Sequence, residues 1–192
     1  VKRINDMDEQ TKILYREILE RYNKIIWTHK INLCQMDIYL TEKKRQNFIL
    51  SIFSVLVSAS AITNIFKWLP EDLIVPLMAF LSLALTYFTT KYKAENLEKK
   101  AADNERFAAI MHDLRNRYAG LLVDIKAGLY TKEQISEKRI QLEQIENIIY
   151  SGLVPYTSVD AVNKASVALK NRQESTTTDE EIANIISSNL QL

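Results

Sequence analysis

Two long apolar stretches with a short polar stretch between them constrain this chain more than any other feature. Residues 47–66 and 73–90 contain no charged side chain, and only the six residues 67–72 separate them. Their lengths, 20 and 18 residues, are close to what a helix needs to cross about 30 Å of hydrocarbon. Because so short a spacer returns the chain to the side it came from, the sequence predicts a two-transmembrane helical hairpin.

The alternative is a helical hairpin buried in a soluble bundle. The second stretch is apolar on all sides, and a chain of 192 residues has no other large body in which to bury two such helices. Three glycines and three prolines also leave little room for the turns of a sheet. The predicted fold class is all-α, with a transmembrane hairpin whose helices extend into a cytoplasmic helical bundle.

The charges that flank the two stretches predict the orientation of the hairpin. The connecting loop, 67–72, has one lysine against the carboxylates of Glu71 and Asp72. Cytoplasmic flanks carry an excess of Lys and Arg, which predicts an external loop and a multi-pass inner-membrane protein with both termini cytoplasmic. The basic residues before the first stretch and after the second are Lys43, Lys44, Arg45, Lys91, Lys93, Lys99 and Lys100.

Each apolar stretch carries a line of small or hydroxylated residues at helical spacing. Such a line packs helices against one another, because small residues let backbones approach, or it forms the wet wall of a pore. Spacing alone favours packing, and two spans cannot enclose an aqueous path without further copies of the chain. The first line is Asn47, Ser51, Ser54, Ser58 and Ala61, and the second includes Ser82, Thr86 and Thr90.

The segments outside the hairpin read as helices. Residues 1–46 contain an amphipathic cytoplasmic helix that starts near Asp8, and 91–173 contain a long helix and a bundle. With no breaker between Thr90 and Gly120, the second span is predicted to continue as one rod to about Ala127. A heptad-type line of apolar residues on it predicts a bundle or oligomer seam. Its members are Phe107, Met111, Leu114, Tyr118, Leu121 and Ile125.

Turn signals divide the rest of the chain. Gly128 ends the rod, and Thr131 with Gln134 forms a capping box that opens the next helix. Ser158 is predicted to cap a last packed helix whose inward residues are Val159, Val162 and Leu169. A polar linker and a short amphipathic helix, which is either a docking peptide or frayed, complete 174–192.

The sequence offers little that suggests an enzyme or a cofactor. Residues 111–116 (MHDLRN) resemble the phospho-accepting box of histidine kinases, but Arg117 stands where that box has proline and no ATP-binding region follows. His29 and Cys34 are five residues apart, which does not suit a shared metal ion. A net charge of +1 argues against nucleic-acid binding, and one cysteine excludes an internal disulfide. We therefore expect no catalytic residues, cofactor or metal.

Four stretches of the chain, taken in order, carry a family resemblance. They are 27–30 (WTHK), the two apolar stretches with their loop, 113–125 (DLRNRYAGLLVDI), and 148–150 (IIY) followed by 154–158 (VPYTS). Together they resemble a SLATT domain, a two-transmembrane module of prokaryotic conflict systems, over roughly 13–169. The family has Ala-Pro-Arg-Thr-Ser at the last position, so Val154 and Tyr156 depart from its pattern.

The resemblance implies a membrane effector of a prokaryotic defence system. Such domains are thought to perturb membranes and to work with nucleotide-signal synthases or sensors. We expect this chain to form homo-oligomers in the lipid bilayer and to make a pore, or otherwise disrupt the membrane, when a partner protein or nucleotide signal activates it. The alternative is a non-conducting membrane anchor or scaffold whose bundle recruits a soluble partner.

Overall fold

The computed structural model describes residues 8–58, 71–152 and 154–171, and their side chains except those of 71–75, 170 and 171. Every regular element in these ranges is helical, which confirms the all-α class for the described part of the chain. The elements are α1 (Glu9–Val57), α3 (Glu71–Glu95), α4 (Leu97–Ala127), α5 (Lys132–Ser151), α6 (Val159–Ser166) and a π-helical turn, η2 (Val167–Asn171).

The chain forms two compact units, which are described separately. One unit takes its described residues from 1–35 and 103–192, and we call it the bundle. The other unit is Met36–Ala102, and we call it the hairpin. Helices α1 and α4 each contribute residues to both units.

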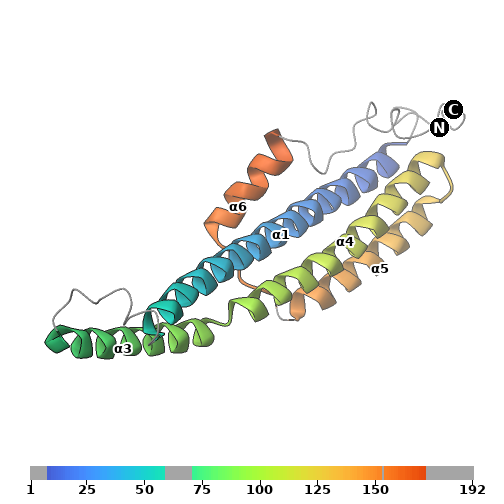
Figure 1. Ribbon diagram of the computed structural model, residues 1–192. Helices are drawn as coiled ribbons and strands as arrows, with labels where there is room; N and C mark the ends of the chain where they lie inside the picture. Colours follow the sequence, from blue (N-terminus) through green and yellow to red (C-terminus); the bar gives the residue numbers. More distant parts are fainter. Residues whose placement is uncertain (1–7, 59–70, 153, 172–192) are drawn as a thin grey trace, which may run out of the picture. The chain divides into compact units, whose positions relative to one another are not determined.

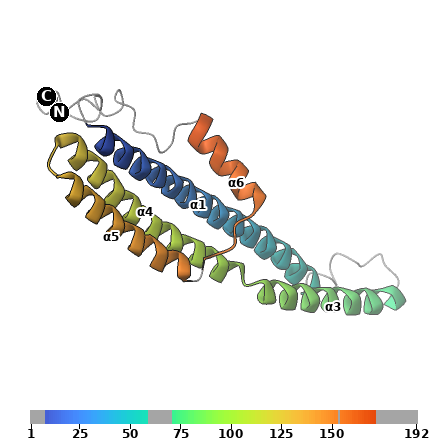
Figure 2. The ribbon, with the colours of Figure 1, turned by 180° about the vertical axis from the view of Figure 1, so that it is seen from behind.

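In the bundle, α1, α4 and α5 lie side by side, as Figure 1 and the reverse view in Figure 2 both show. Residues of all three helices meet in one apolar core, in which Ile18, Ile25 and Met111 are fully buried. The six residues of the predicted seam all lie in this core, each at most 5% exposed. The seam therefore packs within a single chain, against α1 and against Ile135 of α5.

The turn between α4 and α5 follows the sequence signals closely. Gly128 has φ 72°, and its N–H donates to the carbonyl of Ile125 at 3.0 Å. Glycine adopts this left-handed conformation without the strain that a Cβ brings. The Thr131 side chain accepts from the backbone of Gln134, and the Gln134 side chain accepts from the backbone of Thr131. The predicted capping box is thus confirmed.

Helix α6 starts where predicted, but the inward face is a different one. The Ser158 hydroxyl caps it by accepting from the N–H of Ala161 at 3.3 Å, and the N–H of Ser158 donates to Oε1 of buried Gln35 on α1 at 2.7 Å. Val159 is 76% exposed and Val162 41%, so their predicted burial is wrong. The small residues Ala161, Ala165 and Ala168 face inward instead, with Leu169 as predicted, because alanines allow close approach.

Helix α1 begins at the predicted place and runs without a break into the hairpin. Asp8 caps it, since its carboxylate accepts from the backbone N–H of Thr11 at 3.3 Å and from the Thr11 hydroxyl at 2.6 Å. The helix then continues for 49 residues to Val57. The amphipathic segment and the described part of the first apolar stretch are therefore one rod.

Within the hairpin, the end of α1 runs antiparallel to α3 and to the start of α4. The contacts step down α1 as they step up the partner: the rings of Phe53 and Phe88 have centroids 5.4 Å apart, and Lys43 Nζ lies 2.7 Å from Glu98. Nearer the bundle end of this segment, Tyr39 packs in a small cluster with Leu97 and Ala101. The described parts of these helices thus pack antiparallel to one another.

The predicted rod from the second stretch to Ala127 is interrupted at Asn96. This residue has φ 47° and separates α3 from α4. Asparagine tolerates the left-handed region better than other residues with a Cβ, so one residue suffices to stop one helix and start the next. The expectation of one continuous helix was wrong because Asn96 does not read as a breaker in a run of helix-forming residues.

Among the described residues, no helix is both long enough and apolar enough to span a bilayer. The prediction of two transmembrane helices is therefore not borne out by the described helices. Part of the first predicted span, 59–66, and most of the loop lie outside the described residues, as do the side chains of 71–75. For the rest of the two stretches, the structure describes the helices that they form, the contact between these helices, and the side chains that face outward.

Candidate functional site

The small and hydroxylated residues of both stretches lie on the surface of the hairpin. The hydroxyls of Ser51 and Thr86 each donate a hydrogen bond of 2.9 Å to the carbonyl four residues earlier, on Asn47 and Ser82. Both hydroxyl donors therefore have a partner within their own helix. Ala61 lies outside the described residues. The exposed members are Asn47, Ser51, Ser54 and Ser58 on the first stretch and Ser82, Thr86 and Thr90 on α3. We call these two lines the hydroxyl stripes.

A different face of α1 packs on α3. Ile49, Phe53 and Val57 are partly buried, and Phe53 meets Phe88. At 100° per residue, this contact face lies about 130° around the helix from the hydroxyl stripe. The described hydroxyl residues therefore do not make the contact between the two helices of one hairpin.

Helix α3 has the same order of faces. Its partly buried residues include Leu81, Leu85 and Phe88, and its hydroxyl stripe again lies about 130° beyond them in the direction in which residues advance. When two antiparallel helices share this relation, both stripes come to the same side of the plane that contains the helix axes. The hairpin thus has one hydroxyl side.

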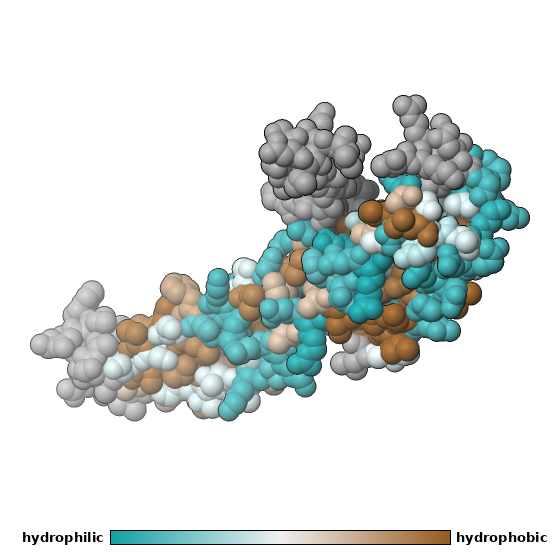
Figure 3. Space-filling model, turned by 90° about the vertical axis from the view of Figure 1, so that its right-hand side faces the viewer, coloured by the Kyte–Doolittle hydropathy of each residue, from teal (hydrophilic) through white to brown (hydrophobic). Residues whose placement is uncertain are grey.

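The opposite side of the hairpin is apolar and exposed. Figure 3 shows brown and white surface over much of the hairpin, which is the fainter part of that view. Monomeric soluble proteins seldom expose so many large apolar side chains together, so such a surface indicates contact with lipid or with another protein. The six residues are Phe48 (66% exposed), Ile52 (45%), Val55 (62%), Phe80 (67%), Leu83 (70%) and Tyr87 (62%).

Polar contacts close one end of the hairpin. The Gln46 side chain is buried and donates to Glu95 Oε2 at 2.5 Å, and Lys43 pairs with Glu98. The hydrogen bond from Lys43 lowers the pKa of Glu98 below its usual value. These contacts hold the two helices together beside the Asn96 break, at the end of the apolar stretches where basic residues begin.

A partly buried polar network crosses the bundle and was not predicted. Arg21 on α1 forms ion pairs with Glu143 at 3.1 Å and Glu146 at 3.2 Å on α5, and the Tyr118 hydroxyl on α4 donates to Glu146 at 3.1 Å. Burial, followed by the Glu146 carboxylate, raises the pKa of Tyr118 above its usual range, so the phenol keeps its proton. The network ties all three helices together at one level.

The histidine of the kinase-like box is in contact with the only other histidine. His112 is exposed on α4, and its ring centroid lies 5.6 Å from that of His29 on α1. The neighbouring acid, Asp113, accepts from Arg117 Nε at 2.8 Å. An arginine thus holds the carboxylate that a phosphorelay would use as a base, which weakens the kinase-like interpretation of this segment.

His29 is held in its neutral form. Its Nδ1 is buried and has no hydrogen-bond partner among the described residues. Burial, followed by the positive charges of Arg115, His112 and Lys30, lowers the pKa of His29 to about 4. A neutral histidine in this place stabilises the bundle only while it stays unprotonated.

Acidification between pH 6.5 and pH 4 is therefore expected to lower the stability of the bundle. In this window the unfolded chain binds a proton at His29, whereas the folded chain does not until the pH falls to about 4. The midpoint of urea unfolding should fall as the pH falls through this window. His29→Gln should flatten that dependence, and the matched His112→Gln should keep most of it; equal slopes in both variants would contradict the assignment.

The described residues offer no metal centre. They contain no group of three or more His, Cys, Asp or Glu that could hold a metal ion. Cys34 is a buried thiol on α1 that forms no disulfide. The two-sided hairpin is the candidate functional surface of this chain, because its exposed residues divide into a hydroxyl side and an apolar side.

Comparisons with known proteins give one family match. Residues 14–181 match the model of SLATT_4, which is described as SMODS and SLOG-associating 2TM effector domain family 4. The match includes residues of both the bundle and the hairpin. Searches of curated proteins and of solved structures found no match.

Proposed function

The chain belongs to SLATT_4, the SMODS and SLOG-associating 2TM effector domain family 4, and from that premise we propose that it is a pore-forming effector of the inner membrane. The observation that carries the proposal is the two-sided hairpin, with hydroxyl stripes on one side and large exposed apolar residues on the other. Each side suits a different surrounding, water for the first and hydrocarbon for the second.

In the proposed assembly, several copies surround an axis with their hydroxyl sides inward and their apolar sides toward lipid. Two helices cannot enclose an aqueous path, so the pore requires a homo-oligomer. Neither apolar stretch contains a charged side chain or a histidine, so the wall of the pore would be neutral. Ser51 and Thr86 satisfy their hydroxyls within their own helices, and this leaves their oxygens able to accept from water.

The proposed topology places the bundle in the cytoplasm. The excess of lysine and arginine on the flanks of the two stretches supports this orientation. The family description names effector domains that associate with SMODS and SLOG. A sensor protein or a nucleotide-signal-producing protein is accordingly the proposed activating partner, and it would reach the bundle from the cytoplasm.

Leakage from liposomes tests the proposal. The full chain is reconstituted at rising protein-to-lipid ratios, so that mass action drives assembly, while chemical crosslinking records the oligomers. Release of an encapsulated dye should rise together with the crosslinked oligomer. Vesicles that stay sealed although inserted oligomers are present would contradict the pore.

That contradicting outcome would favour the alternative, a non-conducting anchor whose bundle recruits a soluble partner. One observation supports this alternative independently: the bundle exposes Tyr156 (74%), Val159 (76%) and Val167 (47%) along and beside α6. Apolar residues at such exposure suit a protein partner. Substituting Val159 by Ser should then weaken partner recruitment and leave dye release unchanged.

A further inference from the structure

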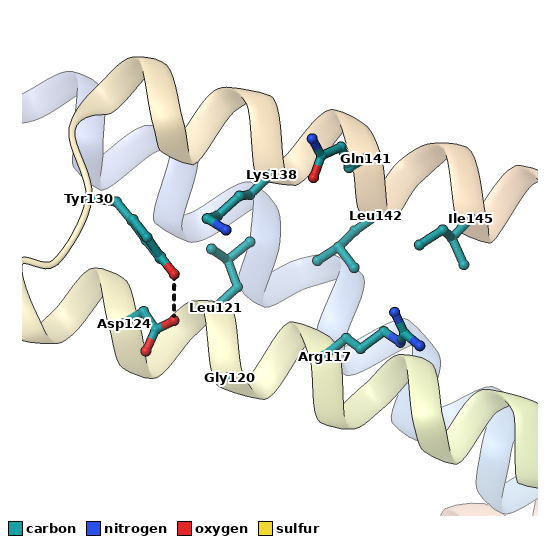
Figure 4. A pocket seen from close by; sticks show the side chains of 9 residues that line it. All are labelled: Arg117, Gly120, Leu121, Asp124, Tyr130, Lys138, Gln141, Leu142 and Ile145. Carbon is teal, nitrogen blue, oxygen red and sulfur yellow. Dashed lines mark hydrogen bonds between the residues drawn. The ribbon is translucent and has the colours of Figure 1, made fainter.

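The bundle contains a cavity of about 310 Å³ between α4 and α5, close to the turn that joins these two helices. Figure 4 shows the side chains that line it. The volume is at the lower end of the range for small-molecule pockets, about 300–1,000 Å³. Its floor is apolar and is formed by Leu121, Leu142 and Ile145.

One end of the cavity carries a cation beside an aromatic ring. The Lys138 ammonium lies 4.6 Å from the centre of the Tyr130 ring, and it forms no ion pair among the described residues. The Tyr130 hydroxyl donates to Asp124 Oδ2 at 3.1 Å, which fixes the ring. The other oxygen of Asp124 has no hydrogen-bond partner in the described structure, so it is able to accept an N–H group.

The other end of the cavity carries Arg117. Its Nε donates to Asp113, and its two terminal nitrogens have no partner in the described ranges. Figure 4 shows the guanidinium below Leu142 and Ile145, at the end away from Tyr130. Asp124 lies seven positions after Arg117 on the helix, which is about 10 Å along the axis. The cavity is thus an elongated slot with cations along it and an acceptor at one end.

Gly120 keeps the slot open. It lies in the interior of α4, where glycine destabilises a helix relative to alanine. No packing requirement explains it, because a Cβ added at Gly120 would meet no heavy atom within 4 Å. A side chain here would instead extend into the cavity, so glycine leaves room for something that is not part of the chain.

We propose that this slot binds a small anion with a flat ring, whose phosphate or carboxylate is held by Arg117 at one end and whose ring edge meets Lys138 and Asp124 at the other end, where an N–H group of the ring donates to Asp124. The ring lies on Leu121 and Leu142 over the space left by Gly120. Because its ligand touches both α4 and α5, binding stiffens the pair of helices. The inference concerns the bundle alone and does not rest on pore formation by the hairpin.

Binding is tested by calorimetry on the full chain in lipid nanodiscs, with no leakage readout. AMP is the ring-bearing phosphate and benzoate the ring-bearing carboxylate; adenosine supplies the ring alone and inorganic phosphate the anion alone. AMP should bind saturably and at least about tenfold more tightly than adenosine or phosphate, because the charge-assisted hydrogen bonds and the ring contacts act together. If neither AMP nor benzoate binds saturably at millimolar concentration, the proposal is overturned.

Variants locate the site. Gly120→Leu should abolish AMP binding without lowering the melting temperature, since it fills the slot and adds a better helix former. Arg117→Gln and Lys138→Gln should each weaken AMP at least about tenfold. Lys126→Gln, an exposed lysine of α4 outside the slot, is the matched control and should bind as the wild type does. Unchanged AMP binding in Arg117→Gln and Lys138→Gln would place any bound AMP elsewhere and reject the site.

Discussion

Replacing Ser54 and Ser58 by Leu is expected to reduce dye release from liposomes at least about tenfold while the chain stays in the membrane. Both residues belong to the hydroxyl stripe and are exposed in the hairpin. A pore wall that loses its hydroxyls becomes a hydrophobic constriction, and such constrictions close to ions by dewetting. Insertion should not suffer, because each leucine favours the bilayer by about 0.3–0.6 kcal/mol.

The matched control is Val55→Leu, one position away on the apolar side, where the side chain is 62% exposed. This variant changes a side chain at the same depth of the hairpin but leaves the hydroxyl side unchanged, so dye release should persist. Crosslinking separates two outcomes: loss of release with oligomers intact supports a hydrated wall, whereas loss of oligomers shows that the stripes pack one copy on another. Undiminished release from the double variant would exclude the hydroxyl side as the path.

The second large effect concerns the bundle core. Leu114→Ala is expected to destabilise the chain by about 2–5 kcal/mol, the range for a buried leucine whose removal leaves a cavity. Leu114 is 1% exposed and packs in the core that α1, α4 and α5 share. Chemical denaturation followed by circular dichroism in nanodiscs measures the change.

Val123→Ala provides the comparison for that measurement. Val123 is on the same helix but is 64% exposed. Its truncation should therefore lower the free energy of unfolding by much less than Leu114→Ala does. If both variants unfolded at the same denaturant concentration, the α4 seam would not be the core of a single chain. The seam would then be expected to pack between copies, and its stability would depend on protein concentration.

Local signals in the sequence predicted one end each of α1, α4, α5 and α6. Asp8, Gly128, Thr131 and Ser158 act through their own backbone or through groups within a few residues, so their roles follow from the printed order of residues. The α4 seam could also be predicted from the sequence, because a spacing of three and four residues keeps its members on one face of the helix. Whether that face packed within one chain or between chains depended on the other helices, and spacing could not decide it.

The errors have a common physical origin. Asn96 adopts a left-handed conformation, and the ion pair of Lys43 with Glu98 lies next to it. No local sequence pattern predicts this conformation. The valines of α6 were expected inside because they are apolar, yet the buried face of this helix carries Ala161 and Ala165, and the helices around α6 decide which face that is. The network of Arg21, Glu146 and Tyr118 joins three helices, so only the folded chain brings it together.

The two sides of the hairpin could be predicted only in part from the sequence. The hydroxyl stripes were predicted from spacing, and Phe48, Ile52 and Val55 carry an equally regular spacing of four and three that marks the opposite face. What spacing could not give was the contact face, because that depends on Phe53 meeting Phe88. Only with the contact face fixed do both stripes fall on one side.

Thiol labelling in liposomes tests that two-sidedness directly. Cys34 is the single cysteine, so replacing it by alanine leaves a background in which Ser54→Cys and Val55→Cys each present one thiol at the same depth. A charged, membrane-impermeant maleimide should label Ser54→Cys at least about tenfold faster than Val55→Cys, because only the hydroxyl side contacts water. Equal labelling rates at the two positions would contradict a hairpin with one side in water and the other in lipid.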